Sequence, residues 1–303
     1  MKRREFLRTG VPGAAVAALV PATAVLGASG IKNSNNRKKP ELRLAMQERI
    51  IPGDMLDAKL DFLEKHGFSG IEPGGTGLPD RINEFQQALR SRKVKVCAVT
   101  SGFKGYMLTT NPKEKENFDN TFRDILIAAG ELGAAGVVMV PVQNRHRDAM
   151  PYNMETREYL VQQMKEWGDF ALTHETTVIL EPLKREYAYF IRLVADAAAI
   201  CRDAGSNGAR CLGDFYHMYE EETSNYGAFW SGSKYLKHVH IASMVKRQMP
   251  GEEPEIDDYR DGFRALQELN YQGHISFECG TGSDPLVTIP AAVKWLKWQW
   301  DSV

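Results

Sequence analysis

From residue 41 onward the chain alternates short apolar runs with amphipathic segments of helical length, and this alternation constrains the fold most strongly. The apolar runs are Leu42–Met46, Ser69–Glu72, Val94–Val99, Ala135–Pro141, Thr177–Glu181, Ala209–Asp214, Leu236–Ile241 and His274–Glu278. Helical candidates follow them near residues 54–66, 81–92, 114–132, 155–174, 188–204, 224–234, 257–270 and 284–300. Runs that are apolar throughout, such as 137–140, are typical of parallel strands buried on both faces.

Strands that alternate with helices in this way predict an α/β protein, a single (β/α)8 TIM barrel over residues 41–303. The whole chain has 303 residues, and barrels of this kind commonly need about 250. The main alternative is an open, doubly wound sheet. No G-x-G-x-x-G motif follows the first apolar run, which disfavours the dinucleotide-binding form of that sheet.

The first 40 residues have the character of an export segment. Arg3 and Arg4 precede an apolar, alanine-rich run, so residues 1–30 resemble a twin-arginine signal peptide, and residues 31–40 form a polar linker. We expect export of the folded, metal-loaded protein to the periplasm, with no membrane span after processing. An uncleaved membrane anchor is the alternative, which the shortness of the run and Gly10, Pro12 and Pro21 disfavour.

Polar side chains that could bind a metal end four successive apolar runs. They are Glu181, Asp214, the pair His238 and His240, and Glu278. Active sites of barrels lie at the C-terminal ends of the strands, so these groups are predicted to meet there. One divalent cation would satisfy them together. Three carboxylates and one imidazole favour Mn²⁺, with Mg²⁺, Co²⁺ or Zn²⁺ as alternatives.

Each of these residues also has an ordinary structural interpretation. Glu181 could be an acid at a helix N-terminus, Asp214 could cap the following turn, and Glu278 could pair with a basic residue. The two histidines face the same side of their strand, and His240 is favoured as the ligand because it lies nearer the strand end. The occurrence of all four groups on consecutive strands favours the metal site.

These residues resemble the ketose 3-epimerases of the xylose-isomerase-like barrel superfamily. Residues 181–185 read E-P-L-K-R where that family has E-P-L-N-R, and Asp214 with His217 matches its D-x-x-H segment. The H-x-H pair followed by Pro250-Gly251 matches a further segment, and Glu278 stands as the final ligand. Two positions differ from the family, because Lys246 replaces an arginine, with Arg247 next, and Tyr187 replaces a glutamate.

The resemblance implies that the metal is held by Glu181, Asp214, His240 and Glu278. It also implies that Glu181 and Glu278 flank the substrate and exchange its proton. The candidates for substrate binding are His217, Lys246, Arg247, Arg185 and, at the end of the second strand, Glu72.

The implied reaction is isomerisation or epimerisation of a sugar or sugar derivative, by proton removal beside a carbonyl through an enediolate. One alternative is a lyase or hydratase acting on 3-keto-glycosides, and another is a non-catalytic, exported sugar-binding barrel. Base-site DNA endonucleases of the same superfamily are disfavoured, because their extra histidines are missing. A net charge of -1 gives no reason to expect a nucleic-acid partner. Whether the chain forms a homo-oligomer is left open.

Overall fold

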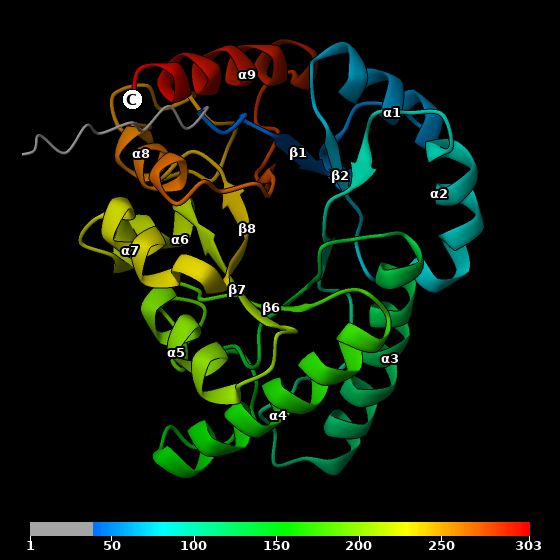
Figure 1. Ribbon diagram of the computed structural model, residues 1–303, viewed down its shortest axis with the longest axis vertical. Helices are drawn as coiled ribbons and strands as arrows, with labels where there is room; N and C mark the ends of the chain where they lie inside the picture. Colours follow the sequence, from blue (N-terminus) through cyan, green and yellow to red (C-terminus); the bar gives the residue numbers. More distant parts are fainter. Residues whose placement is uncertain (1–38) are drawn as a thin grey trace, which may run out of the picture. The chain divides into compact units, whose positions relative to one another are not determined.

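The computed structural model describes residues 39–303, which form one compact unit (Figure 1). The predicted signal peptide and most of the predicted linker therefore lie outside the described residues. Residues 39 and 40, at the end of that linker, have no regular secondary structure. Within the described part, no helix is both long and apolar enough to cross a membrane.

The strands of this unit make one parallel sheet that closes into a barrel, as predicted. They are β1 (Leu44–Gln47), β2 (Gly70–Glu72), β3 (Lys95–Val96), β4 (Val99–Thr100), β5 (Val137–Met139), β6 (Val178–Leu180), β7 (Ala209–Asp214), β8 (Leu236–Ile241) and β9 (Ile275–Phe277). Their order is β3-β2-β1-β9-β8-β7-β6-β5-β4. The first and last strands pair directly, with Leu44 opposite Ile275.

The third predicted strand, Val94–Val99, is two short strands in the structure. Its first half pairs with β2 and its second half with β5, so the chain changes partner between them. Cys97 lies at the change, where its N–H donates to the Ile71 carbonyl and its carbonyl accepts from the Ala135 N–H. The single predicted strand is therefore corrected to β3 and β4, because both neighbours must be reached for the barrel to close.

A close backbone approach at Gly75 completes the closure. The chain that follows β2 runs on beside β4, with the Gly75 N–H donating to the Thr100 carbonyl at 3.0 Å. A β-carbon built on Gly75 would lie 2.0 Å from the Ser101 carbonyl oxygen, so only glycine allows the two segments to meet. This glycine therefore has a structural role in the barrel wall.

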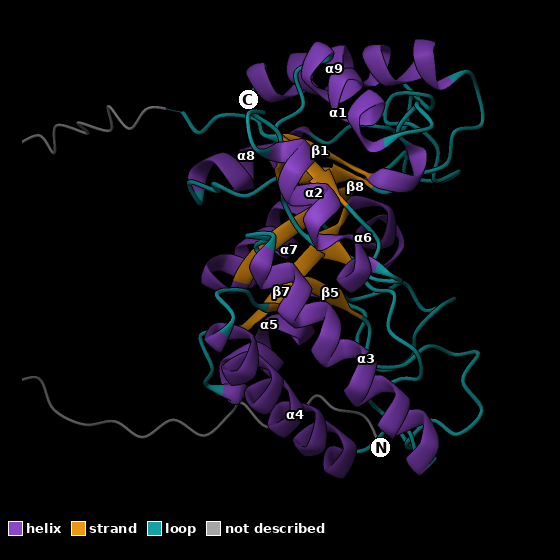
Figure 2. Ribbon diagram, turned by 90° about the vertical axis from the view of Figure 1, so that its right-hand side faces the viewer, coloured by secondary structure: helices purple, strands orange, loops and turns teal. Residues whose placement is uncertain are grey.

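Helices surround the barrel, as Figures 1 and 2 show from two directions. They are α1 (Leu56–Lys65), α2 (Ile82–Leu89), α3 (Pro112–Glu131), α4 (Met154–Thr173), α5 (Val194–Ala204), α6 (Phe215–Glu221), α7 (Asn225–Gly232), α8 (Arg260–Glu268) and α9 (Pro285–Asp301). The sequence did not indicate α6, a short helix whose N-cap is the strand-end residue Asp214. The predicted helix 188–204 begins only at Val194, because residues 182–193 form a loop above β6.

Two hydrophobic clusters hold the unit together. The larger cluster contains the helix faces and the strand residues that face them, and the smaller one contains Ala45, Cys97, Ala98, Val138, Ile179 and Leu212. Along β5, Val138 belongs to the small cluster while Val137 and Met139 belong to the large one, as the two-residue period of a strand requires. The small cluster therefore fills the barrel interior.

All four cysteines are buried and free: Cys97, Cys201, Cys211 and Cys279. The two ends of the described chain are tied together, because Lys39 Nζ donates to the carbonyls of Trp300 and Val303 at 2.8 and 2.9 Å.

Candidate metal centre and active site

Four neighbouring strands bring Glu181, Asp214, His240 and Glu278 together at the C-terminal mouth of the barrel. Glu181 directly follows β6, Asp214 ends β7, His240 lies in β8 and Glu278 directly follows β9. Asp214 pairs in register with His240 across the sheet. One potential ligand atom from each side chain lies within 4.8 Å of the others, and all but Glu278 are fully buried.

The donor set fits a divalent cation. Among the described residues, the buried atoms Asp214 Oδ2 and Glu278 Oε2 have no aligned hydrogen-bond partner. Glu278 Oε2 lies 2.9 Å from His240 Nδ1 without that alignment, so the two atoms converge on a shared point. Buried carboxylates and an imidazole that converge in this way suit Mn²⁺, Mg²⁺ or Co²⁺, which bind oxygen and nitrogen ligands.

Glu72 lies behind His240 and contacts it from the side away from the other three candidate ligands. Its Oε1 is 3.0 Å from His240 Nε2, and its Oε2 is 3.1 Å from His238 Nε2. The Glu72 side chain is fully buried, and both its oxygens are occupied by imidazoles. Glu72 is thus positioned to orient His240, whereas the sequence had indicated it as a candidate for substrate binding.

The two candidate catalytic carboxyls have opposite electrostatic surroundings. Burial, reinforced by the charge of Glu278, raises the pKa of Glu181 to about 7. Burial alone would also raise the pKa of Glu278, but the positive charges of His240 and Arg247 outweigh it and hold that pKa at about 2. Such a pair can hold a proton on one carboxyl while the other stays ionised.

Arg247 reaches the centre from the loop that follows β8. Its guanidinium lies 2.9 Å from Glu278 Oε2 and 3.5 Å from Asp214 Oδ2, and it covers the ring of Tyr216 at 4.8 Å. Lys246, the neighbouring candidate, points outward with its Nζ 3.9 Å from Glu253. Arg247 is therefore the basic side chain of this loop that the fold directs toward the four ligands.

Two buried carboxylates build the loop that carries Arg247. Glu253 accepts hydrogen bonds from the backbone N–H groups of Val245 and Lys246, at 3.1 and 2.8 Å. Asp257 accepts from the N–H groups of three further residues, Met244, Gly251 and Glu253. These bonds hold Arg247 at a φ of 54°, a left-handed conformation that costs a non-glycine residue free energy.

His217 lies beside the centre, whereas Arg185 does not. His217 is buried, and its Nε2 is 3.5 Å from Asp214 Oδ2. Its Nδ1 accepts a hydrogen bond from the Lys184 N–H at 3.4 Å, and burial lowers its pKa, so a neutral ring would carry its proton on Nε2. Arg185 instead pairs with Glu221 at 2.8 Å and is mostly exposed.

The sequence analysis did not single out Lys184, although it quoted that residue within the E-P-L-K-R segment. Its side chain is buried, and its Nζ lies 2.6 Å from Glu220 and 4.6 Å from the centre of the Tyr216 ring. Lys184 and Arg247 thus both contact Tyr216. Only the tertiary packing shows this, because a lysine beside an arginine in a loop carries no local signal of burial.

A family model described as the xylose isomerase-like TIM barrel matches residues 60–298. The chain therefore belongs to this family of barrels.

Relatives within the family include a 3-dehydro-D-guloside 4-epimerase of Escherichia coli, 26% identical over 257 residues, covering 82% of this chain and 97% of the relative. A probable ketose 3-epimerase of Synechocystis is 26% identical over 223 residues, covering 71% and 75%. The crystal structure of a 3-keto-D-glucoside 4-epimerase from E. coli has a TM-score of 0.78 at 25% identity, covering 85% of this chain and 100% of that one.

A D-psicose 3-epimerase from Clostridium cellulolyticum shares the fold, with a TM-score of 0.75, 18% identity, and coverage of 86% and 99%. Together these relatives support an enzyme of the isomerase and epimerase class.

Proposed function

We propose that this protein is a metal-dependent epimerase that inverts a carbon beside the carbonyl of an oxidised sugar, a 3-keto-glycoside. The observation that carries the proposal is the convergence of Glu181, Asp214, His240 and Glu278 within 4.8 Å at the C-terminal mouth. The relative that this chain matches over 97% of that relative's length is a 4-epimerase of a 3-dehydro sugar, which supports the substrate class.

The reaction needs one base and one acid near the same carbon. In a 3-keto-glycoside the hydrogen on C4 is acidic because it lies next to the C3 carbonyl. We propose that one of Glu181 and Glu278 removes this proton and the other returns a proton to the opposite face of C4. A divalent cation held by the four ligands would supply positive charge beside the carbonyl oxygen, stabilising the negative charge that proton removal creates.

The other polar groups would hold the sugar. Arg247 and His217 Nε2 lie beside Asp214 and Glu278, so both can donate hydrogen bonds to hydroxyl oxygens of a bound substrate. Glu72 would not contact the sugar. It would orient His240, because both its carboxylate oxygens contact histidine rings. Lys246 and Arg185 point elsewhere, so the proposal gives neither a role with the substrate.

The test is proton exchange followed by NMR in D2O, with the Mn²⁺-loaded protein and methyl 3-keto-glucoside. The expected result is deuterium at C4 together with the 4-epimer. Glu181→Gln and Glu278→Gln should each lower the exchange rate by at least about a hundredfold, the order of magnitude for losing a general acid or base. Glu158→Gln, which changes an exposed carboxylate on α4, is the matched control.

The position of the deuterium separates the alternatives. Removal of the C2 proton would set up elimination of the group on C1, so loss of the C2 hydrogen together with a released aglycone would identify a lyase. Exchange on free ketoses alone would identify a ketose epimerase. Absence of exchange on every substrate, with metal bound at the site, would contradict the proposal and favour a sugar-binding barrel.

We also propose that the enzyme works in the periplasm. The support is the Arg3-Arg4 pair and the apolar run after it in the sequence. Replacing both arginines with lysine should retain the protein in the cytoplasm, as measured by fractionation. Unchanged export of the double variant would contradict export by the twin-arginine route.

A further inference from the structure

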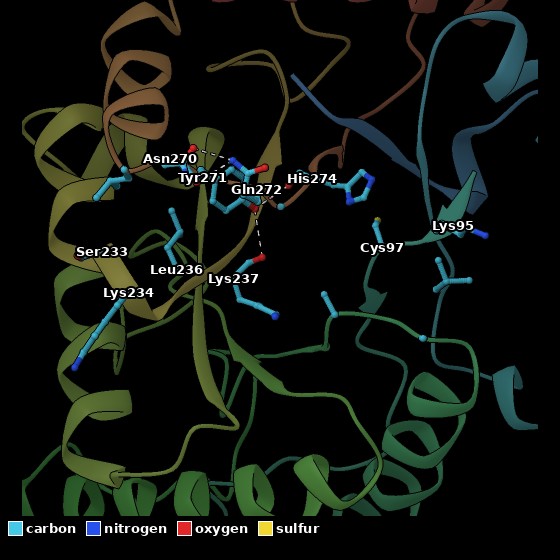
Figure 3. A pocket seen from close by; sticks show the side chains of 15 residues that line it. Lys95, Cys97, Ser233, Lys234, Leu236, Lys237, Asn270, Tyr271, Gln272 and His274 are labelled. Carbon is cyan, nitrogen blue, oxygen red and sulfur yellow. Dashed lines mark hydrogen bonds between the residues drawn. The ribbon is translucent and has the colours of Figure 1, made fainter. Parts of the chain in front are cut away.

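A cavity lies at the N-terminal mouth of the barrel, at the opposite end from the candidate metal centre. It measures about 500 Å³, within the range of small-molecule sites. It is lined where β3, β8 and β9 begin, by residues that include Lys95, Lys237 and His274. Figure 3 shows Lys237 on one side of this space, with the His274 ring, Cys97 and Lys95 on the other side.

The charged side chains that line this cavity are all basic. Its described lining contains Lys95, Lys234 and Lys237 but no aspartate or glutamate. Arg43 and Arg210 adjoin it, because Arg43 Nη1 donates to the carbonyl of the lining residue Gln272 at 2.7 Å, and Arg210 acts electrostatically on Lys237. The chain as a whole has a net charge of -1, so this is a local concentration of cations.

These cations lack acidic partners. Within residues 39–303, none of Arg43, Lys95, Arg210, Lys234 and Lys237 forms an ion pair with a carboxylate. Many other basic side chains of the same unit do have such a pair, Arg81 and Arg92 among them. These five cations without a carboxylate partner therefore lie at or beside the N-terminal mouth.

Lys237 is the clearest example of a cation in this cavity that has no anionic partner. It lies on a strand, its side chain is partly buried, and Figure 3 shows it directed into the space. Burial, followed by the charge of Arg210, lowers its pKa, so its ammonium group is destabilised in the protein alone. A partly buried cation is stabilised by an anion, and the described residues supply none here.

The remaining lining indicates what kind of anion would fit. Asn270 and Gln272 offer amide groups and Ser233 a hydroxyl, whereas Val96, Leu236 and Leu269 are apolar. We propose that the N-terminal mouth binds a small organic anion with at least two anionic oxygens, such as a phosphate ester or a polycarboxylate. Lys237 lies at the centre of this site, with Arg43, Arg210 and Lys95 around it.

The test is calorimetric binding of pyrophosphate and of citrate to the full-length, metal-free protein. Metal is removed because both probes chelate divalent cations. The buffer contains about 0.15 M NaCl, where screening acts over roughly 8 Å and weak surface attraction is suppressed. We expect at least one probe to bind and to raise the melting temperature.

Substitutions then locate the binding. Lys237→Gln should weaken it about tenfold or more, the loss that follows when a charged hydrogen bond is removed. Lys95→Gln, at an exposed position, should weaken it less and serves if Lys237→Gln fails to fold. Lys294→Gln, an exposed change on α9, should have no effect. Arg247→Gln should also have none, since it removes the cation at the other mouth.

The outcomes decide the proposal and its ligand class. Binding of pyrophosphate alone identifies phosphoryl groups, binding of citrate alone identifies carboxylates, and binding of both identifies the wider class. Binding of neither probe would overturn the proposal. So would an affinity unchanged by both Lys237→Gln and Lys95→Gln, or one abolished by Arg247→Gln. None of these readouts depends on turnover, so the result is independent of the proposed epimerase activity.

Discussion

Glu72 gives the sharpest prediction about the candidate metal centre, because it contacts His240 without facing the other three candidate ligands. The Glu72 Oε1 atom lies 3.0 Å from His240 Nε2 in a fully buried environment. Glu72→Gln keeps the size of the side chain and removes its charge. Carboxylates that orient a ligating histidine contribute about 10- to 100-fold to metal affinity, so we expect Mn²⁺ to bind weaker by that factor. Each factor of ten corresponds to about 1.4 kcal/mol.

The assay is a Mn²⁺ titration by calorimetry in competition with a chelator, with the melting temperature recorded in parallel. The metal-free melting temperature separates a weakened centre from a damaged fold. Glu158→Gln, at an exposed position, should bind Mn²⁺ as the unmodified protein does. A Glu72→Gln affinity within about twofold of the unmodified protein, well below the effect of a supporting carboxylate, would refute the reasoning. Failure of the unmodified protein to bind Mn²⁺, Mg²⁺ or Co²⁺ would refute the metal centre itself.

Two further predictions concern stability. Gly75→Ala places a β-carbon 2.0 Å from the Ser101 carbonyl, so we expect a loss of about 1–3 kcal/mol by chemical denaturation, whereas Gly74→Ala, with open space around it, should cost far less. Equal losses of stability in Gly75→Ala and Gly74→Ala would show that the backbone is not closely packed against Gly75. Burial, with the positive charges of His238 and Arg43, lowers the pKa of His274 from 6.5 to about 4. The unfolded chain therefore takes up a proton at higher pH than the folded one, and stability falls between pH 6.5 and 4 by up to about 3 kcal/mol. In His274→Gln this part of the pH dependence should be missing, and an unchanged pH profile would contradict the assignment.

Local sequence patterns were sufficient to predict the bounds of a strand that keeps the same neighbouring strands along its whole length. The predicted bounds of β7 and β8 are those of the structure, and each of these strands keeps the same two neighbours in the sheet. The run Val94–Val99 looked equally continuous in sequence, yet it changes partner at Cys97. That change is imposed by closure of the whole sheet, which no local pattern records.

In the candidate site, too, some features could be predicted from the sequence and others could not. The sequence predicts that Glu181, Asp214, His240 and Glu278 meet, because a parallel barrel brings strand ends together. The sequence indicated Glu72 only as a candidate for substrate binding, and its contacts with His238 and His240, 166 and 168 residues away, follow from the tertiary fold.

The choice between Lys246 and Arg247 was also beyond local reasoning. The loop that carries them is folded by the backbone hydrogen bonds of Glu253 and Asp257, so tertiary contacts decide which of two adjacent cations faces inward.

The pairing of β1 with β9 has a consequence for biosynthesis. During translation the barrel cannot close until the last strand has left the ribosome, so the edges of β1 and β8 stay unpaired until then. Unpaired strand edges of this kind can pair with other chains, so the incomplete barrel is exposed to aggregation during this interval. Glu278 emerges with that same strand. The last carboxylate of the candidate metal centre is therefore synthesised with the last strand of the barrel, and the four candidate ligands can meet only once that strand is in place.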